Sequence, residues 1–252
     1  MKKIFLSIVV PSFNEVNNLE RGCLESFFKY LKNCHFNYEV IFSDDGSTDQ
    51  TCELLTQIIK KNPQCSLLVN QHRGKGPTVI SGLKKAQGKW VLFTDFDQST
   101  PLQEFNKFKP YLKEDFQVII GSREISQAKR QKEPFYRHFM GRMFNFLVQV
   151  LAIPGVLDTQ CGFKVFNQEV LTKILHKITI YQVKKNRQDA YTGAFDVELL
   201  YLARKFNFRL KEVAIVWRHY KTNRVNPLKD SIRMLIDIFK IKLADWAGKY
   251  DD

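Results

Sequence analysis

Two carboxylates separated by a single residue, Asp95 and Asp97, directly follow the apolar segment Trp90–Thr94. This segment has no polar alternation, which is typical of a strand buried on both faces of a sheet. In an open α/β sheet, ligands bind beyond the carboxyl ends of the strands. Two carboxylates at such an end suit a hard divalent cation that also holds a substrate diphosphate. An ordinary acidic turn, before a helix that Pro101 would open, is the alternative that this segment alone leaves open.

Four more polar motifs follow predicted strands in the same way. Continuous apolar or β-branched residues predict strands at 4–10, 38–43, 66–70 and 117–121, with helices between them. This alternation predicts right-handed crossovers and a mainly parallel sheet flanked by helices, which is an α/β fold. Because the carboxyl ends of parallel strands share one edge, the motifs should converge there, which favours a site over unrelated turns. The motifs are Pro11–Glu15, Asp44–Asp49, His72–Gly76 and Gly121–Arg123.

Local signals predict the segments around these motifs. Apolar residues at helical spacing from Leu19 to Leu31 predict one helix, opened by a capping box of Asn17 and Glu20. The polar segment 126–133 is predicted to be a mobile loop. Segment 210–217 is predicted to be one further strand.

Composition limits the class of protein and its partners. The 252 residues are 44% hydrophobic, which is ample for the core of one large α/β domain or two small ones. A net charge of +13 indicates an anionic partner, such as nucleic acid, lipid headgroups or phosphorylated small molecules. The five cysteines show no CxxC spacing and the histidines lie far apart, so a disulfide framework or a structural zinc site is not expected, and a cytoplasmic location is favoured.

Membrane contact is expected to be peripheral. The apolar N-terminal run is short and ends in Pro11, which indicates a first buried strand rather than a signal peptide. No run approaches the roughly 18 to 20 apolar residues that cross a bilayer. Residues 227–252 carry an apolar stripe with basic residues on the other faces, which predicts a basic amphipathic helix. We therefore expect a domain at 1–226, followed by a helix at 227–252 that contacts the inner face of the cell membrane.

Together the motifs resemble the family 2 glycosyltransferases of GT-A fold, which are inverting enzymes that use sugar nucleotides. The resemblance runs from about Ile4 to Ile241. Two further motifs, Asp158–Lys164 (DTQCGFK) and Phe195–Leu200 (FDVELL), are similar to those of the dolichyl-phosphate β-glucosyltransferases and their bacterial polyprenyl-phosphate relatives. The other matches are PSFNE (11–15), DDGSTD (44–49), RGKG (73–76), DFD (95–97) and GSR (121–123).

The resemblance implies a donor site for a sugar nucleotide, with UDP-glucose favoured. Asp95 and Asp97 would hold Mg²⁺ or Mn²⁺ against the diphosphate, and Ser99 stands where mannosyl relatives place a third ligand, with Gln98 beside it. Asp97, Arg123, Asp158 and Asp196 are the expected catalytic residues, of which Asp158 and Asp196 would contact sugar hydroxyls. The residues expected to bind the nucleotide and its phosphates are Pro11, Phe13, Glu15, Asp44, Asp45, Lys75 and Asp95.

The acceptor implied by the resemblance is a polyprenyl phosphate. Transfer to an alcohol needs a general base, whereas a lipid phosphate is already anionic and needs none. Catalysis then consists of placing the phosphate oxygen behind the anomeric carbon and stabilising the departing nucleotide. Basic side chains suit the task of holding two anionic substrates together. Those expected to bind the acceptor phosphate are Lys129, Arg130, Lys132, Arg137 and Arg224.

Three alternatives stay open at this point. The donor would be GDP-mannose or a UDP-N-acetylhexosamine in one of them. In the second, the acceptor would be a hydroxyl of a glycan or lipid, and Asp196 occupies roughly the place where such relatives keep a base. A non-catalytic nucleic-acid-binding protein is the third, and it does not explain acids gathered at strand ends, so no nucleic-acid partner is expected. The pattern does not specify an oligomeric state.

Overall fold

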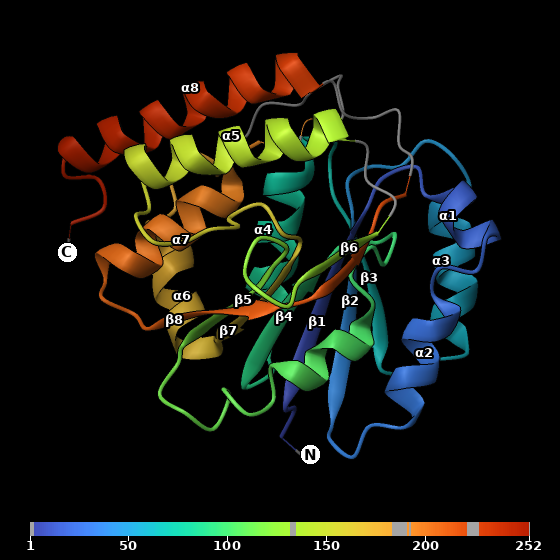
Figure 1. The fold of residues 1–252 in the computed structure, drawn as a ribbon. Helices are drawn as coiled ribbons and strands as arrows, with labels where there is room; N and C mark the ends of the chain where they lie inside the picture. Colours follow the sequence, from blue (N-terminus) through green and yellow to red (C-terminus); the bar gives the residue numbers. More distant parts are fainter. Residues whose placement is uncertain (1–2, 132–134, 183–190, 192, 221–226, 252) are drawn as a thin grey trace.

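The computed structural model describes residues 3–131, 135–182, 191, 193–220 and 227–251, with only the helical backbone for 135–140 and 227–229. Its centre is a seven-stranded sheet of order β3-β2-β1-β4-β7-β5-β8 (Figure 1). β7 is antiparallel to both of its neighbours, and the other pairs are parallel. The mainly parallel sheet is therefore confirmed. Its strands are β1 (Leu6–Ser12), β2 (Tyr38–Asp44), β3 (Cys65–Val69), β4 (Trp90–Thr94), β5 (Val118–Ser122), β7 (Phe163–Asn167) and β8 (Leu210–Ala214).

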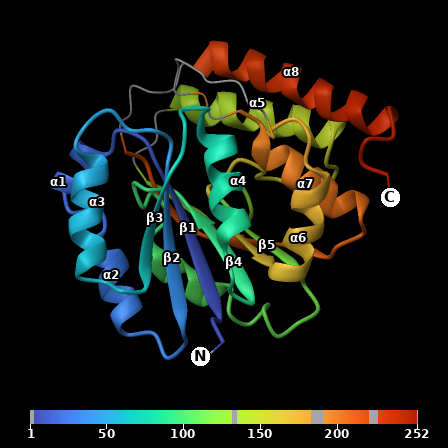
Figure 2. The same ribbon diagram turned by 180° about the vertical axis from the view of Figure 1, so that it is seen from behind.

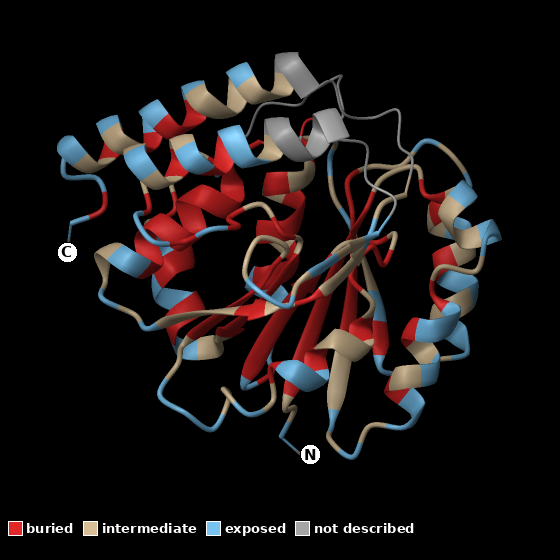
Figure 3. Cartoon of the chain, in the orientation of Figure 1, coloured by how far each residue is buried: buried red, intermediate tan, exposed pale blue. Residues whose placement is uncertain are grey.

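The central strands are buried along their whole length. Every residue of β1, β4 and β5 is buried, because helices cover both faces of the sheet (Figure 3). This double coverage is the reason why these strands are continuous apolar runs without alternation. Burial of each large apolar side chain contributes about 1.5–3 kcal/mol to the free energy of folding. The sheet is therefore a stable base for the loops at its edge.

Two helical layers enclose the sheet. Side chains of α2 (Glu25–Lys32), α3 (Thr51–Lys60) and the 3₁₀ helix η1 (Leu102–Lys107) form the core on one face. The opposite face is covered by α4 (Lys75–Lys85), α6 (Gln168–Lys177) and α7 (Phe195–Lys205). Beyond them, α5 (Phe135–Leu151) and α8 (Pro227–Trp246) lie side by side (Figures 1 and 2). The inner faces of both helices belong to the same core.

The predicted helix from Leu19 to Leu31 is two helices. α1 (Val16–Glu20) ends before Gly22, which has a φ of +71°, and α2 begins at Glu25. The capping box was also wrong: Glu15 is the N-cap residue of α1 and makes no side-chain capping bond. Periodicity did not detect this interruption, because a left-handed glycine reverses the chain without disturbing the spacing of apolar residues.

Three further elements differ from their predictions. The segment that begins after Pro101 is the 3₁₀ helix η1 rather than an α-helix. The predicted loop 126–133 contains β6 (Lys129–Gln131), which pairs in parallel with β9 (Val216–Arg218). The predicted strand 210–217 is divided at Ile215 into β8, which extends the main sheet, and β9, which pairs with β6. β6 is short and polar, and its pairing partner lies far away in the sequence, so no local pattern reveals it.

Candidate active site

The polar motifs converge at one edge of the sheet, as the sequence predicts. β2, β1 and β4 are neighbours, and their carboxyl ends are Asp44, Ser12 and Thr94. Segment 158–162 reaches the same edge differently: it precedes β7, and because this strand is antiparallel its beginning lies where the others end. The backbone N–H of Asp95 donates to the carbonyl of Gly162 at 3.2 Å, which joins this segment to the DxD motif.

Asp45 organises the loop that precedes α4. Its Oδ1 accepts hydrogen bonds from the backbone N–H of Arg73 at 2.9 Å and from the hydroxyl of Thr78 at 2.7 Å. Its Oδ2 lies 2.8 Å from Nδ1 of His72 and accepts from the N–H of Gly74 at 3.0 Å. Both carboxylate oxygens thus hold protein groups in place. A contact between Asp45 and a base or ribose stays a prediction.

Asp44 stabilises the turn that follows β2 in the same way. Oδ2 accepts from the hydroxyls of Ser12 at 2.8 Å and Ser47 at 2.6 Å, and Oδ1 accepts from the N–H of Ser47 at 2.7 Å. Asp44 is fully buried. Its geometry therefore links the ends of β1 and β2, and its predicted nucleotide contact is likewise untested.

An aromatic wall lies beside these carboxylates. The ring of Phe13 stacks on His72 with 4.4 Å between centroids and 2° between planes. Pro11 is buried in β1, and the buried carboxylate of Glu15 accepts a hydrogen bond from the amide of Asn18. A flat, half-exposed ring next to hydrogen-bonding loops is a surface on which a planar base can stack. Sequence reasoning gave His72 no role, because its contact with Phe13 joins two separate loops.

The two carboxylates of the DxD motif have different partners. Oδ1 of Asp95 forms an ion pair with Nζ of Lys75, the first residue of α4, at 2.5 Å. Asp97 accepts from the N–H of Ser99 at 2.9 Å and from its hydroxyl at 2.8 Å. Burial and the neighbouring charge of Asp95 raise the pKa of Asp97. Burial would lower the pKa of Lys75, but the ion pair with Asp95 and the nearby acids raise it.

These residues fit a divalent cation. Two carboxylates in mutual repulsion are a hard, anionic donor set, and Mg²⁺ is commonly bound by one or two carboxylates together with substrate phosphates. The amide N–H₂ of Gln98 donates to the carbonyl of Asp95 at 2.9 Å, while its buried Oε1 has no hydrogen-bond partner. In the described part of the chain, no three or more His, Cys, Asp and Glu side chains are grouped so that they could hold a metal ion by themselves. The hydroxyl of Ser99 supports Asp97, and its role as a ligand stays a prediction.

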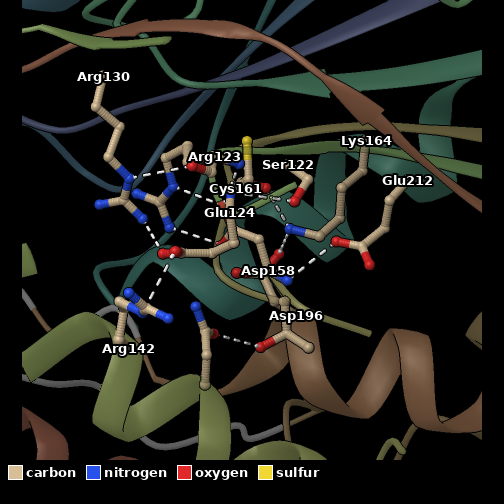
Figure 4. Close-up of polar contacts among 12 residues, drawn as sticks. Ser122, Arg123, Glu124, Arg130, Arg142, Asp158, Cys161, Lys164, Asp196 and Glu212 are labelled. Atoms are coloured by element: carbon tan, nitrogen blue, oxygen red, sulfur yellow. Dashed lines mark hydrogen bonds and ion pairs between the residues drawn. The ribbon is translucent and has the colours of Figure 1, made fainter. Parts of the chain in front are cut away.

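Arg123 and Asp158 form a buried, bidentate ion pair (Figure 4). Nε and Nη2 of Arg123 donate to the two carboxylate oxygens of Asp158 at 2.7 and 2.8 Å, and its N–H donates at 2.9 Å. Burial would raise the pKa of Asp158, but the guanidinium outweighs it and lowers the pKa to about 2. In this arrangement both oxygens of Asp158 bind Arg123, which also lies over the ring of Trp217 at 5.3 Å. Asp158 thus positions Arg123, and its contact with sugar hydroxyls is untested.

Asp196 forms the second buried ion pair at this edge. Its Oδ1 lies 2.5 Å from Nζ of Lys164, which also donates to the carbonyl of Cys161 (Figure 4). Burial raises the pKa of Asp196 despite this lysine. A Cβ at position 162 would lie 2.0 Å from Asp95, so only glycine lets this segment approach the DxD motif. Lys164 belongs to the motif Asp158–Lys164, and sequence reasoning assigns it no role, although a lysine within an apolar strand is a signal for a buried charge.

The structure describes two of the residues expected to bind the acceptor phosphate. Lys129 is exposed on β6, and Arg130 is half-buried beside it. The guanidinium of Arg130 forms an ion pair with Glu124 and donates to the carbonyl of Arg123 at 3.3 Å (Figure 4). Lys132, Arg224 and the side chain of Arg137 lie outside the described residues, so their roles stay predictions.

Arg21 is a site residue that sequence reasoning missed. Its Nη2 donates to the carbonyl of Asp97 at 3.0 Å, and its guanidinium lies 3.8 Å from the ring centroid of Tyr220. The contact joins the end of α1 to the DxD loop and to the segment after β9. All three are distant in sequence, so no local signal was available.

Comparison with known proteins points to one family. Residues 7–175 match the model of the family described as glycosyl transferase family 2. A dolichyl-phosphate β-glucosyltransferase of Dictyostelium discoideum is 35% identical over 97% of this chain and 76% of its own length. That of Mus musculus is 30% identical over 97% of this chain and 77% of its own length.

Solved structures show the same fold. Glucosyl-3-phosphoglycerate synthase of Mycobacterium tuberculosis, in complex with Mn²⁺, UDP and glucosyl-3-phosphoglycerate, superposes with a TM-score of 0.62 at 18% identity, covering 96% of this chain and 79% of the other. A mannosyltransferase of Pyrobaculum calidifontis in complex with GDP-mannose and Mn²⁺ superposes with a TM-score of 0.61 at 17% identity. The superposition covers 97% of this chain and 66% of the other. The α/β fold of GT-A type is therefore confirmed. With the family model matching most of its length, the chain belongs to the family 2 glycosyltransferases and is a glycosyltransferase enzyme.

Proposed function

We propose that this enzyme transfers glucose, with inversion, from UDP-glucose to the phosphate of a polyprenol such as dolichol. The observation that carries the proposal is the pair Asp95 and Asp97 beside Lys75 at the carboxyl edge of the sheet. Two anions and a cation in this position suit a metal-bound nucleotide diphosphate. The names of the Dictyostelium and mouse relatives support glucose and dolichyl phosphate, because the similarity extends over 97% of the chain.

Asp95 and Asp97 would hold Mg²⁺ or Mn²⁺. When bound, the cation neutralises charge on the departing diphosphate. Lys75 is near enough to both acids to add a second positive charge to the same group. The stacked ring of Phe13 would receive the uracil. The Mn²⁺ in the two structural neighbours supports a divalent cation of this kind.

The acceptor side of the proposal depends on charge. A phosphate oxygen needs no general base, so its attack requires only placement behind the anomeric carbon and shielding from water. Arg123 and Arg130, at the end of β5 and on β6, would supply the positive field for this second anion. Asp196 is buried and held by Lys164. This pairing favours a structural role for Asp196 and thereby supports a phosphate over a hydroxyl acceptor.

The proposal includes a membrane surface formed by α5 and α8. No helix in the described part of the chain is long and apolar enough to span a bilayer. Large apolar side chains nevertheless point to solvent from both of these adjacent helices, and they are Met143, Phe146, Val150, Ile232, Ile236, Phe239, Leu243 and Trp246. Exposed basic residues on the same helices, Arg142 and Lys240, complement anionic lipid headgroups. We place this surface on the cytoplasmic face of the membrane, in keeping with the free cysteines of the chain.

Replacing the two exposed aromatic rings of α8, Phe239 and Trp246, should separate the protein from lipid. Phe239→Ser combined with Trp246→Ser should weaken co-sedimentation with phosphatidylcholine–phosphatidylglycerol vesicles roughly tenfold or more, because each large apolar group contributes on the order of 1.5–3 kcal/mol when buried. Val69→Ser is the control, because Val69 is an exposed apolar residue, 60% accessible, that lies on β3 and belongs to neither helix. Equal sedimentation of both variants would contradict the membrane surface.

A radiolabelled transfer assay tests the reaction itself. UDP-glucose, UDP-N-acetylglucosamine and GDP-mannose would be offered in parallel, each with and without a short polyprenyl phosphate and with Mg²⁺, Mn²⁺ or a chelator. We expect label in the organic phase from UDP-glucose only, and only with both lipid and metal. Label transferred from another donor would show that the proposed donor, UDP-glucose, is wrong. Donor hydrolysis without lipid labelling would reject the acceptor.

A further inference from the structure

Two buried tyrosines and one aspartate connect α8 to the body of the protein. Oδ2 of Asp237 on α8 accepts hydrogen bonds from the hydroxyls of Tyr181 at 2.5 Å and Tyr191 at 2.7 Å. Its Oδ1 lies 3.0 Å from Nζ of Lys240. All three members of this cluster are less than a tenth exposed. A buried carboxylate is stable only when it is hydrogen-bonded, so these contacts fix where α8 lies relative to the segment that carries the tyrosines.

The tyrosines continue this connection towards the donor site. The backbone carbonyl of Tyr191 accepts from the N–H of Lys75 at 3.1 Å. This is the lysine whose ammonium pairs with Asp95 at 2.5 Å. The hydroxyl of Tyr181 accepts from the N–H of Ala194, the residue before α7. The helices α4 and α7 therefore both begin at this cluster.

The ring of Tyr181 is held in place by close packing against two glycines, Gly76 and Gly193. A Cβ at Gly76, in the first turn of α4, would lie 2.7 Å from this ring, and a Cβ at Gly193 would lie 2.5 Å from its hydroxyl oxygen. Gly193 has a φ of +71°, which glycine adopts without strain. Tyr181 therefore donates a hydrogen bond to Asp237 and packs against Gly76 in the first turn of α4. A shift of Asp237 would thus displace the ring that this turn contacts.

We propose that Asp237, Tyr181 and Tyr191 are positioning residues of the donor site, which hold the first turn of α4 so that Lys75 meets the diphosphate of the sugar nucleotide. The proposal rests on the function proposed above, since it requires that this site binds a sugar nucleotide. Its physical basis is that electrostatic groups act on a substrate only where they are held in place in advance. The same aspartate lies on α8 between the exposed Ile236 and Phe239, so the proposed membrane helix is part of this support.

The test is binding of UDP in the presence of Mn²⁺, measured by isothermal titration calorimetry. Tyr191→Phe keeps the ring and the carbonyl that receives Lys75, and it removes the hydroxyl that donates to Asp237. We expect a roughly fivefold weaker affinity, because one buried hydrogen bond contributes about 1 kcal/mol. Tyr181→Phe should weaken binding more, because it removes two hydrogen bonds.

Tyr201→Phe is the matched control. The hydroxyl of Tyr201 on α7 donates to Asp245, which is eight residues after Asp237 and therefore about 12 Å further along α8. Both variants lose a tyrosine–aspartate bond to α8, and Tyr201→Phe also loses the contact of its hydroxyl with Nζ of Lys242 at 3.4 Å. Both should therefore lower the melting temperature, while only Tyr191→Phe weakens UDP binding. An equal change in affinity for both, or no change for Tyr191→Phe, would overturn the proposal. Absence of UDP binding to the wild-type protein would instead overturn the proposed function.

Discussion

Asp97→Ala is expected to abolish metal-dependent donor turnover while the protein stays folded. Asp97 is one of the two carboxylates that we propose to hold the cation, and it lies after the end of β4 rather than in the core. Loss of one preorganised electrostatic contact to a transition state typically costs on the order of 10²–10³ in rate, and loss of a metal ligand should cost at least as much. Its removal relieves repulsion with Asp95 but takes the acceptor from two donors of Ser99, so we expect a folded protein with a small change in stability.

The measurement combines labelled transfer, Mn²⁺ titration and a thermal melt. Asp115→Ala is the control, because Asp115 is an exposed aspartate that pairs with Arg209 at the surface. We expect wild-type activity from Asp115→Ala and none from Asp97→Ala, with a cooperative melting transition for both variants. Full activity of a folded Asp97→Ala protein would refute the metal assignment.

Asp158→Asn is expected to cost both stability and activity. The variant keeps the shape of the side chain but places an amide N–H₂ group against the guanidinium of Arg123. Both groups are hydrogen-bond donors, so this contact is lost. Removing one partner of a buried ion pair leaves the other charge uncompensated, and we expect a loss of about 2–4 kcal/mol in the free energy of unfolding. Transfer should fall as well, because Arg123 is no longer held at the end of β5.

The stabilisation by this ion pair should depend on pH in a defined direction. The pKa of Asp158 is about 2 in the folded protein and 3.8 ordinarily. Since the folded pKa is the lower one, the unfolded chain binds the proton more readily, and the stabilisation is complete above about pH 4 and lost as the pH falls towards 2. A shift of roughly 1.8 units corresponds to about 2.5 kcal/mol.

Urea unfolding between pH 7 and pH 2 measures this effect. The deficit of Asp158→Asn relative to wild type should be constant above pH 4 and should shrink towards pH 2. Asp115→Asn, in the exposed Asp115–Arg209 pair, should show no measurable deficit, because solvent screens such pairs. A deficit of Asp158→Asn that does not change with pH would show that the ion pair is not its cause.

The strands of the sheet, and the edge at which the polar motifs meet, could be predicted from the sequence. Double burial requires continuous apolar strands, so β1, β2, β4 and β5 were recognisable within one or two residues. Parallel topology then brings the residues after those strands together without any knowledge of their contacts. Asp95, Asp97 and Arg123 follow from this argument, and the motif resemblance supplied the family.

The pairing of the charges at that edge could be read only from the three-dimensional structure. Asp158 with Arg123, Asp196 with Lys164, and Asp45 with the loop before α4 all join segments that are distant in sequence. The same is true of the β6–β9 pair and of the adjacent apolar faces of α5 and α8. Periodicity and turn chemistry report only what neighbouring residues prefer, whereas a buried charge is stabilised by whichever distant group the fold brings within hydrogen-bonding distance. For this reason the location of the site could be predicted from the sequence, but the partner of each side chain could not.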